Sequence, residues 1–161
     1  MVGKLQAEIQ QHKPFRSVKA EAFLNILRTA DGLTRDLETM LKPHGLTSTQ
    51  YNLLRILRGA GAAGATCSAI GERMIKRDPD VTRLLDRMEK LGLLRRTRQA
   101  KDRRVVTATI TLKGRRLADD LDARVDEFHT HRLQALSKDK LAELINDMER
   151  IRNQHAVAAL P

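Results

Sequence analysis

Residues 78–92 carry the start and stop signals of one short helix, and their place directly before two strand-like segments limits the fold more than any other feature of the chain. Asp78 is a typical helix cap. Pro79 suits the first helical position, where the missing N–H costs nothing. Gly92 provides the left-handed residue that commonly ends a helix. We therefore predict a helix from Asp78–Pro79 to about Lys90.

The two segments after Gly92 favour β-strands. Leu93–Arg98 can form one strand, and residues 106–112 alternate apolar side chains with threonines, as in a strand with one buried face. The polar, basic turn at 99–102 has no Asn-Gly pair, which indicates a long loop rather than a tight two-residue turn. This region therefore predicts a β-hairpin with a basic tip.

The rest of the chain is predicted to be helical. Apolar residues recur every three or four positions, as on one face of a helix. Thr47 and Gln50 have the spacing of a capping box, and Gly59–Gly64 is predicted to be a flexible loop. The fold class is mainly α, with four helices, a small β-hairpin wing and two further helices. Outside the helix that starts at residue 78, the predicted helices begin at residues 17, 47, 66, 111 and 137.

Composition excludes several classes of protein. The 161 residues suit about one domain, and apolar residues make up 41% without any run near the roughly 20 that a membrane-spanning helix needs. The N-terminus does not read as a secretory signal, so we expect a cytoplasmic protein with no membrane partner. The single cysteine, Cys67, cannot form an internal disulfide or a multi-cysteine zinc site.

The net charge of +10 is concentrated in one part of the chain. Residues 73–104 hold twelve Lys and Arg against five Asp and Glu, which is +7 of the total. Such clustering is typical of a surface that binds a polyanion. Aromatic residues are only 2% of the chain, so the stacking platforms that bind single strands are nearly absent. The expected partner is double-stranded DNA.

Two short helices followed by a basic hairpin form a winged helix-turn-helix, in which the second helix enters the major groove. On that helix Leu84, Leu85 and Met88 can turn inward. Arginine suits the recognition of guanine, and a threonine can contact a thymine methyl group or a phosphate. The predicted DNA contacts of this helix are Pro79, Asp80, Thr82, Arg83 and Arg87.

The hairpin adds a second set of candidate DNA contacts. A narrow minor groove attracts guanidinium groups at a loop tip. We interpret Asp102 as a carboxylate that orients a neighbouring arginine. The three strand arginines are equally well explained as ordinary surface charges. The predicted wing residues are Arg95, Arg96, Arg98, Lys101, Asp102, Arg103 and Arg104.

Several ordered motifs resemble the bacterial MarR-type transcriptional regulators over about residues 20–155. They are LTSTQYNLL at 46–54, DPDVTRLLDRME at 78–89, LGLL at 91–94, DRR at 102–104 and ITLKG at 110–114. The resemblance implies a triangular homodimer that binds a pseudo-palindromic operator. It places Asp102 and Arg104 on the family's wing pair and residues 79–87 on its recognition helix. It also implies that a small phenolic or anionic effector binds between the dimerisation helices and the winged domain and changes DNA affinity.

The long flanking helices favour a dimer independently, because their apolar stripes need a partner that a lone winged domain lacks. We expect dimerisation helices at 1–42 and 113–161 around a DNA-binding domain at 43–112. Two-fold symmetry would place two recognition helices about one turn of DNA, roughly 34 Å, apart. Residues 1–14 fit an extra dimer-clasping helix and a flexible tail equally well.

His44 and Tyr51 are the predicted effector-pocket residues, although Tyr51 fits a packing role better. His129 and His131 are two residues apart and diverge on a helix, so they do not form a metal-binding pair. No phosphate loop or nucleophile elbow is present, and we predict no catalytic residues, no metal and no cofactor. The expected function is a ligand-responsive repressor. The alternative is an architectural protein that binds DNA without regard to sequence.

Overall fold

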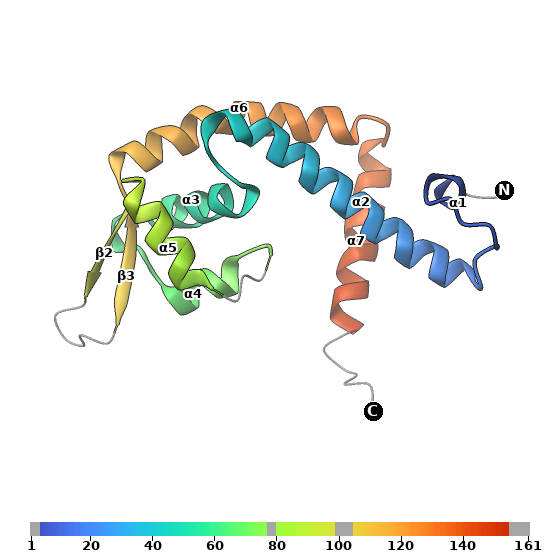
Figure 1. The fold of residues 1–161 in the computed structure, drawn as a ribbon, viewed down its shortest axis with the longest axis horizontal. Coiled ribbons are helices and arrows are strands. Elements are labelled where there is room, and N and C mark those ends of the chain that lie inside the picture. The colour runs from blue at the N-terminus through green and yellow to red at the C-terminus, as the bar shows by residue number, and fades with distance from the viewer. Residues whose placement is uncertain (1–3, 77–79, 99–104, 155–161) are drawn as a thin grey trace. The chain divides into compact units, whose positions relative to one another are not determined.

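The structure is a computed structural model that describes residues 4–76, 80–98 and 105–154. The chain divides into two compact units, the first ending at Asp122 and the second beginning at Ala123. Helices dominate both units, and Figure 1 shows the single small sheet beside α3 and α5. The predicted fold class, mainly α with a β-hairpin wing, is confirmed.

The helices predicted from residues 17 and 47 begin where the sequence places them, and within the first 14 residues, where a helix and a flexible tail fitted equally well, the structure has one short helix. In α1 (Leu5–Glu8), a single turn, Leu5 is buried. The long α2 (Val18–Leu41) is capped by Ser17, whose hydroxyl accepts from the Ala20 N–H at 3.1 Å. A 3₁₀ turn, η1 (Lys42–His44), leads into α3 (Ser48–Ala60). Thr47 and Gln50 form the predicted capping box on α3, with both reciprocal hydrogen bonds present.

The prediction of a flexible loop at Gly59–Gly64 is wrong, because most of this segment lies in the end of a helix and in a 3₁₀ turn. The helix α3 continues to Ala60, and a second 3₁₀ turn, η2 (Gly61–Ala63), follows it. Next comes β1 (Ala65–Thr66), a two-residue strand paired antiparallel with β3. Gly64 has a φ of +67°, and a Cβ there would lie 2.6 Å from Thr109 Cγ2. Only glycine fits this close approach to β3.

The helix-turn-helix and the hairpin follow in the predicted order. Thr66 caps α4 (Cys67–Arg73), and α5 (Val81–Lys90) is the second helix. The strands β2 (Leu94–Arg98) and β3 (Val106–Ile110) pair antiparallel, with Arg96 opposite Ala108. The sheet order is β1-β3-β2. The core joins these elements through fully buried side chains that include Leu53, Leu54, Leu57, Ile70, Leu85, Met88 and Leu94.

Two long helices complete the part of the chain that the structure describes. Thr111 caps α6 (Leu112–Leu133) by accepting from the Gly114 N–H at 3.1 Å, as predicted. Ser137 precedes α7 (Lys138–Gln154), and its hydroxyl accepts from the Lys140 N–H at 3.4 Å. Among the described residues, no helix combines the length and the apolar character that crossing a membrane requires.

Candidate nucleic-acid interface

The second helix of the helix-turn-helix, α5, begins later than the sequence suggests. The prediction placed the cap at Asp78 and helical geometry at Pro79, which both lie outside the described residues. In the structure the cap is Asp80, whose Oδ1 accepts from the Arg83 N–H at 3.0 Å. The same carboxylate forms an ion pair with Arg83 Nε at 2.9 Å. Asp80 therefore has a structural role, and its predicted DNA contact stays a prediction.

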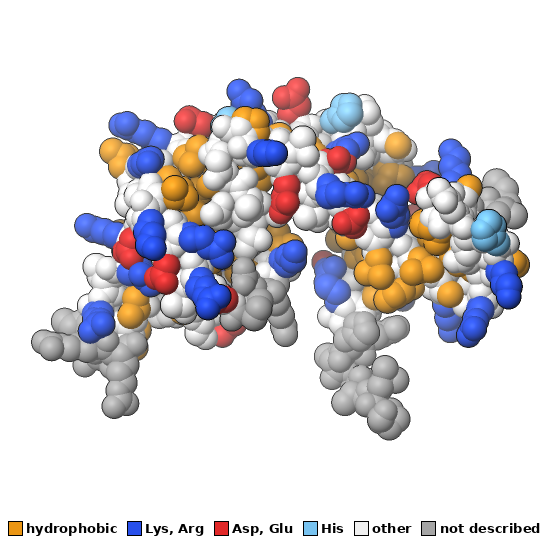
Figure 2. Space-filling view, in the orientation of Figure 1, with side chains coloured by type: hydrophobic (Ala, Val, Ile, Leu, Met, Phe, Trp, Pro, Cys, Tyr) orange, Lys and Arg blue, Asp and Glu red, His pale blue; other side chains and the backbone are white. Residues whose placement is uncertain are grey.

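One face of α5 is buried and the opposite face is free to meet another molecule. Leu84, Leu85 and Met88 are 4% exposed or less, as the inward positions of the sequence prediction require. Thr82, Arg83 and Arg87 are exposed. The major groove of B-DNA is wide enough to admit an α-helix that presents such an exposed face. Figure 2 shows Lys and Arg side chains gathered over α5 and the hairpin, with carboxylates among them.

The three strand arginines of the wing differ in their surroundings. Arg95 and Arg98 are exposed. Arg96 instead faces α5, where its Nη2 lies 2.6 Å from Asp86 Oδ1 and 2.8 Å from Glu89 Oε2. Glu89 also accepts from the backbone N–H of Arg96 at 2.8 Å and from its Nε at 2.9 Å. The contacts between Arg96 and Glu89 therefore hold β2 against α5.

The contacts between Arg96 and Glu89 shift the pKa values of both side chains. The backbone N–H and then the side chain of Arg96 donate hydrogen bonds that lower the pKa of Glu89. Hydrogen bonding to Glu89, above all, raises the pKa of Arg96. Sequence analysis missed this role of Asp86 and Glu89. Their spacing of three residues on α5 and the alternation along β2 are the only signals that could have indicated it.

Replacing Glu89 with glutamine should lower the free energy of unfolding at pH 7 by about 1 kcal/mol, because a partly exposed charged hydrogen bond is lost. The folded-state pKa of Glu89 lies below its ordinary value. Its stabilisation is therefore present above the unfolded-state pKa of roughly 4.3 and is lost as the pH falls through the folded-state pKa. Urea unfolding should show the difference from wild type at pH 7 and pH 5, and a smaller one at pH 3.5. The exposed Glu143→Gln should show no comparable loss, and an equal Glu89→Gln deficit at all three pH values would contradict the assignment.

The start of α6 is fixed to the turn that joins α5 to β2. Gly92 in this turn has the predicted left-handed conformation, with a φ of +70°. The Thr111 hydroxyl donates to Gly92 O at 2.7 Å, and Lys113 Nζ donates to Leu91 O at 2.9 Å. Gly114 is buried against Leu93, because a Cβ on it would overlap Leu93 O. These contacts hold the first turn of α6 against the C-terminal end of α5.

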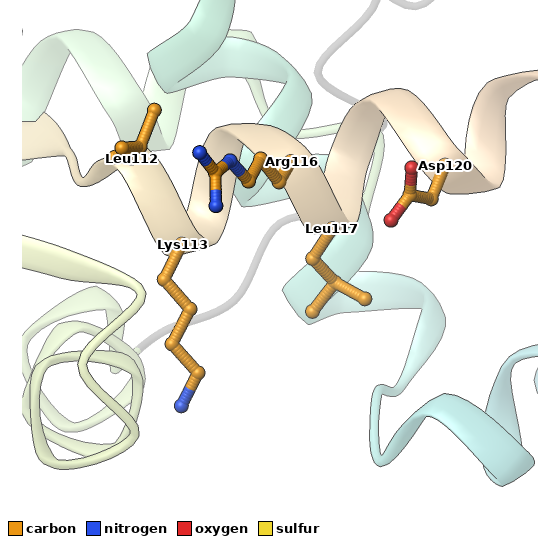
Figure 3. A pocket seen from close by; sticks show the side chains of 5 residues that line it. All are labelled: Leu112, Lys113, Arg116, Leu117 and Asp120. Carbon is orange, nitrogen blue, oxygen red and sulfur yellow. The ribbon is translucent and has the colours of Figure 1, made fainter.

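A shallow hollow of about 470 Å³ lies on the α6 face that includes Lys113. Figure 3 shows Lys113 and Leu117 pointing in the same direction from successive turns of the helix. The residues lining it are Leu112, Lys113, Arg116, Leu117 and Asp120.

The two predicted effector-pocket residues lie in different surroundings. Tyr51 is 4% exposed, and its hydroxyl donates to Asp122 Oδ1 at 3.1 Å. Burial, followed by this hydrogen bond, raises the pKa of Tyr51 to about 12. His44 is half-buried in η1. A hollow of about 420 Å³ beside η1 is lined by Arg35, Glu38, Thr39, Lys42, Leu46 and Thr47, and not by His44.

Asp122 and Arg58 join α3 to α6, a contact that sequence analysis did not anticipate. Arg58 Nη1 lies 2.8 Å from Asp119 Oδ1 and 2.7 Å from Asp122 Oδ2. The Arg58 hydrogen bond lowers the pKa of Asp122 and, reciprocally, raises the pKa of Arg58. Because the partners are 61 and 64 residues apart, no local pattern could predict them.

Other predicted residues lie outside the described part of the chain. These are Pro79 and the wing-tip residues Lys101, Asp102, Arg103 and Arg104. Within the described ranges, no group of three or more His, Cys, Asp or Glu side chains is arranged to hold a metal ion.

The comparison with known proteins identifies the class of this fold. A sequence model of the MarR family matches residues 46–106. Two solved structures share the fold at a sequence identity of 20% or less. The Staphylococcus aureus MepR–DNA complex is 20% identical with a TM-score of 0.74, covering 83% of this chain and 96% of that one. The organohalide-sensing regulator RdhR-CbdbA1625, solved with 2,4-dichlorophenol, is 18% identical with a TM-score of 0.79, covering 89% and 87%.

A closer sequence match comes from the structure of a MarR transcription factor from Planctomyces limnophilus. It is 38% identical, has a TM-score of 0.66, and aligns over 84% of this chain and 98% of its own length. The chain therefore belongs to the MarR family of DNA-binding transcriptional regulators.

Proposed function

We propose that the protein is a homodimeric repressor that binds a two-fold symmetric operator in double-stranded DNA and releases it when a small effector binds. The observation that carries the proposal is α5, which buries Leu84, Leu85 and Met88 and leaves Thr82, Arg83 and Arg87 exposed. A repressor of this kind acts by occupying DNA that the transcription machinery needs.

The proposed homodimer is supported by apolar side chains that the single chain leaves exposed. On α2, Val18, Phe23 and Leu27 are 82%, 62% and 51% exposed. On α7, Ile145 and Ile151 are 59% and 44% exposed. Burying such residues against a second copy would remove apolar surface from water. In this proposal residues 1–42 and 113–161 dimerise and residues 43–112 bind DNA. The chain mass is 18.2 kDa, so sedimentation equilibrium should give about twice that value.

DNA recognition is proposed to use both α5 and the wing. Arg83 and Arg87 would read base edges or phosphates in the major groove, with Thr82 beside them. Arg95, Arg98 and the wing-tip residues Lys101, Arg103 and Arg104 would contact the backbone or the minor groove. Asp102 would orient an arginine of the tip. We assign Arg96 to positioning the wing, since its guanidinium is held by Asp86 and Glu89.

Replacing Arg104 with alanine should weaken DNA binding by about 1–3 kcal/mol if its side chain enters a groove. Fluorescence anisotropy with a labelled operator duplex measures this change. The exposed Arg124, on α6, supplies a control arginine outside the winged domain. Equal affinities for Arg104→Ala and Arg124→Ala would contradict the wing assignment.

The effector is proposed to be a small phenolic or anionic compound. RdhR-CbdbA1625, which shares the fold, was solved with 2,4-dichlorophenol bound. An effector that binds the DNA-free form more tightly lowers operator affinity by its differential affinity for the two forms. His44 and Tyr51 stay candidates for lining its site, and the Tyr51–Asp122 hydrogen bond between α3 and α6 is a contact through which binding could act.

The competing function is architectural binding without sequence preference. The two functions share a steep salt dependence, because both neutralise phosphates. They differ in the ratio of affinities for an operator and a random duplex. Anisotropy at two salt concentrations, with a duplex recovered by selection and a random duplex, should show strong preference for the selected DNA at both. Equal affinities would contradict the repressor proposal.

A further inference from the structure

A third hollow, of about 520 Å³, lies on the helix-turn-helix itself. We call it the α3–α4 hollow. Its volume is within the range of small-molecule sites, roughly 300–1,000 Å³. It is lined by Asn52, Arg55, Ile56, Arg58 and Gly59 of α3, by Arg73 of α4, and by Ile75.

The residues that line the α3–α4 hollow include positively charged arginines and apolar isoleucines. Three of its seven lining residues are arginines, and none carries a carboxylate. Arg58 is neutralised from the α6 side by Asp119 and Asp122. Arg55 and Arg73 are exposed and form no ion pair or hydrogen bond with another described residue, although Arg55 is near enough to Asp122 to help lower the pKa of that carboxyl. Two guanidinium groups at the hollow are therefore available to an anion.

The shape of the hollow depends on contacts between its walls. The Asn52 side-chain oxygen accepts from the Ile75 N–H at 3.0 Å, which fixes the segment after α4 against α3. A Cβ on Gly59 would lie 3.5 Å from Arg73 Nη2, so the Arg73 guanidinium reaches across to α3 at a position without a side chain. Ile56 is buried beneath, whereas Ile75 is 85% exposed at the rim.

We propose that the α3–α4 hollow binds a small organic acid whose carboxylate pairs with Arg55 and Arg73 and whose apolar body covers Ile56 and Ile75. Guanidinium groups form strong, often bidentate hydrogen bonds with carboxylates. By packing on the exposed Ile75 side chain, the apolar body of the acid would remove apolar surface from water.

Arg58 gives this site a link to α6. It lines the hollow and also holds Asp119 and Asp122, with Tyr51 donating to Asp122 from the same helix. A carboxylate bound beside Arg58 competes with the two α6 carboxylates for its guanidinium and so weakens the contact between α3 and α6. This step rests on the proposed effector control of DNA binding, whereas the acid site itself does not.

The test uses the full chain without DNA, with benzoate, phenylacetate and octanoate as probes and benzamide as the uncharged match for benzoate. Amide shifts of Gly59 and Ile75 in NMR titrations report binding at the hollow. The variant Arg55→Gln/Arg73→Gln removes both available charges and leaves Arg58 in place. The control Arg28→Gln/Arg124→Gln removes two exposed arginines on α2 and α6.

We expect at least one acid to shift both amides, the Arg55→Gln/Arg73→Gln variant to weaken its binding about tenfold or more, and the control to bind as wild type does. Benzamide should bind far more weakly than benzoate. No shift with any acid, or equal binding by wild type and variant, would overturn the site. So would a variant that instead loses DNA affinity and salt dependence without any effect on acid binding, because the arginines would then be phosphate contacts. Acid binding that leaves operator affinity unchanged would support the site and contradict the link to DNA release.

Discussion

Replacing Gly114 with alanine should destabilise the winged domain by about 3 kcal/mol or more. The added Cβ would overlap Leu93 O and lie 3.0 Å from Ile110 Cγ1. Neither neighbour can move easily. Leu93 O accepts from the Thr111 N–H at 3.1 Å, and Leu93 itself is 3% exposed. The first turn of α6 would have to separate from the α5–β2 turn, which breaks the contacts that fix α6 to α5.

Gly32→Ala provides the matched control. Gly32 lies within α2, and a Cβ there would meet nothing within 4 Å. Alanine in the interior of a helix is favoured over glycine by up to about 1 kcal/mol, so this variant should be as stable as wild type or more stable. Urea unfolding followed by circular dichroism measures both. A Gly114→Ala protein with wild-type stability would contradict the close packing of α6 on the α5–β2 turn.

Replacing both Arg83 and Arg87 with glutamine should remove most of the preference for operator over random DNA. Each arginine that reads a base contributes about 1–3 kcal/mol, so the double variant should lose about thirtyfold or more of the discrimination. The helix itself should stay folded, because both side chains are exposed and the buried face is unchanged. The Asp80 cap accepts from the Arg83 backbone N–H and survives the substitution.

The control for this variant is Arg28→Gln/Arg124→Gln, which removes the same charge from exposed positions on α2 and α6. It should weaken binding to operator and random DNA by similar factors, because loss of net charge acts on both. Anisotropy with the two duplexes gives the ratio of affinities for each protein. A double variant at Arg83 and Arg87 that keeps the wild-type ratio would move sequence recognition away from α5.

Local signals in the sequence predict most of the secondary structure. The hydroxyls of Thr47, Thr66, Thr111 and Ser137 cap helices that begin where the sequence predicts them to begin. Gly92 ends α5 in the left-handed conformation. Caps and stops depend on residues within about four positions of each other, so the sequence alone can reveal them.

The errors come from features without a local signal. The strand β1 has two residues, too few for alternation to show, and its pairing with β3 depends on chain 41–43 residues away. Two acidic residues, Asp78 and Asp80, compete as the cap of α5, and periodicity does not resolve a shift of two positions. Arg96 and Arg58 face carboxylates that only the folded chain brings near them.

We infer that α5 and the wing, presented twice by a dimer, recognise a particular sequence in double-stranded DNA. Selection of bound fragments from a random duplex pool, followed by sequencing, tests this claim most directly. We expect an enriched, two-fold symmetric motif whose half-sites lie about one turn of DNA, roughly 34 Å, apart. A pool that shows no enriched sequence after repeated selection at moderate salt would contradict it.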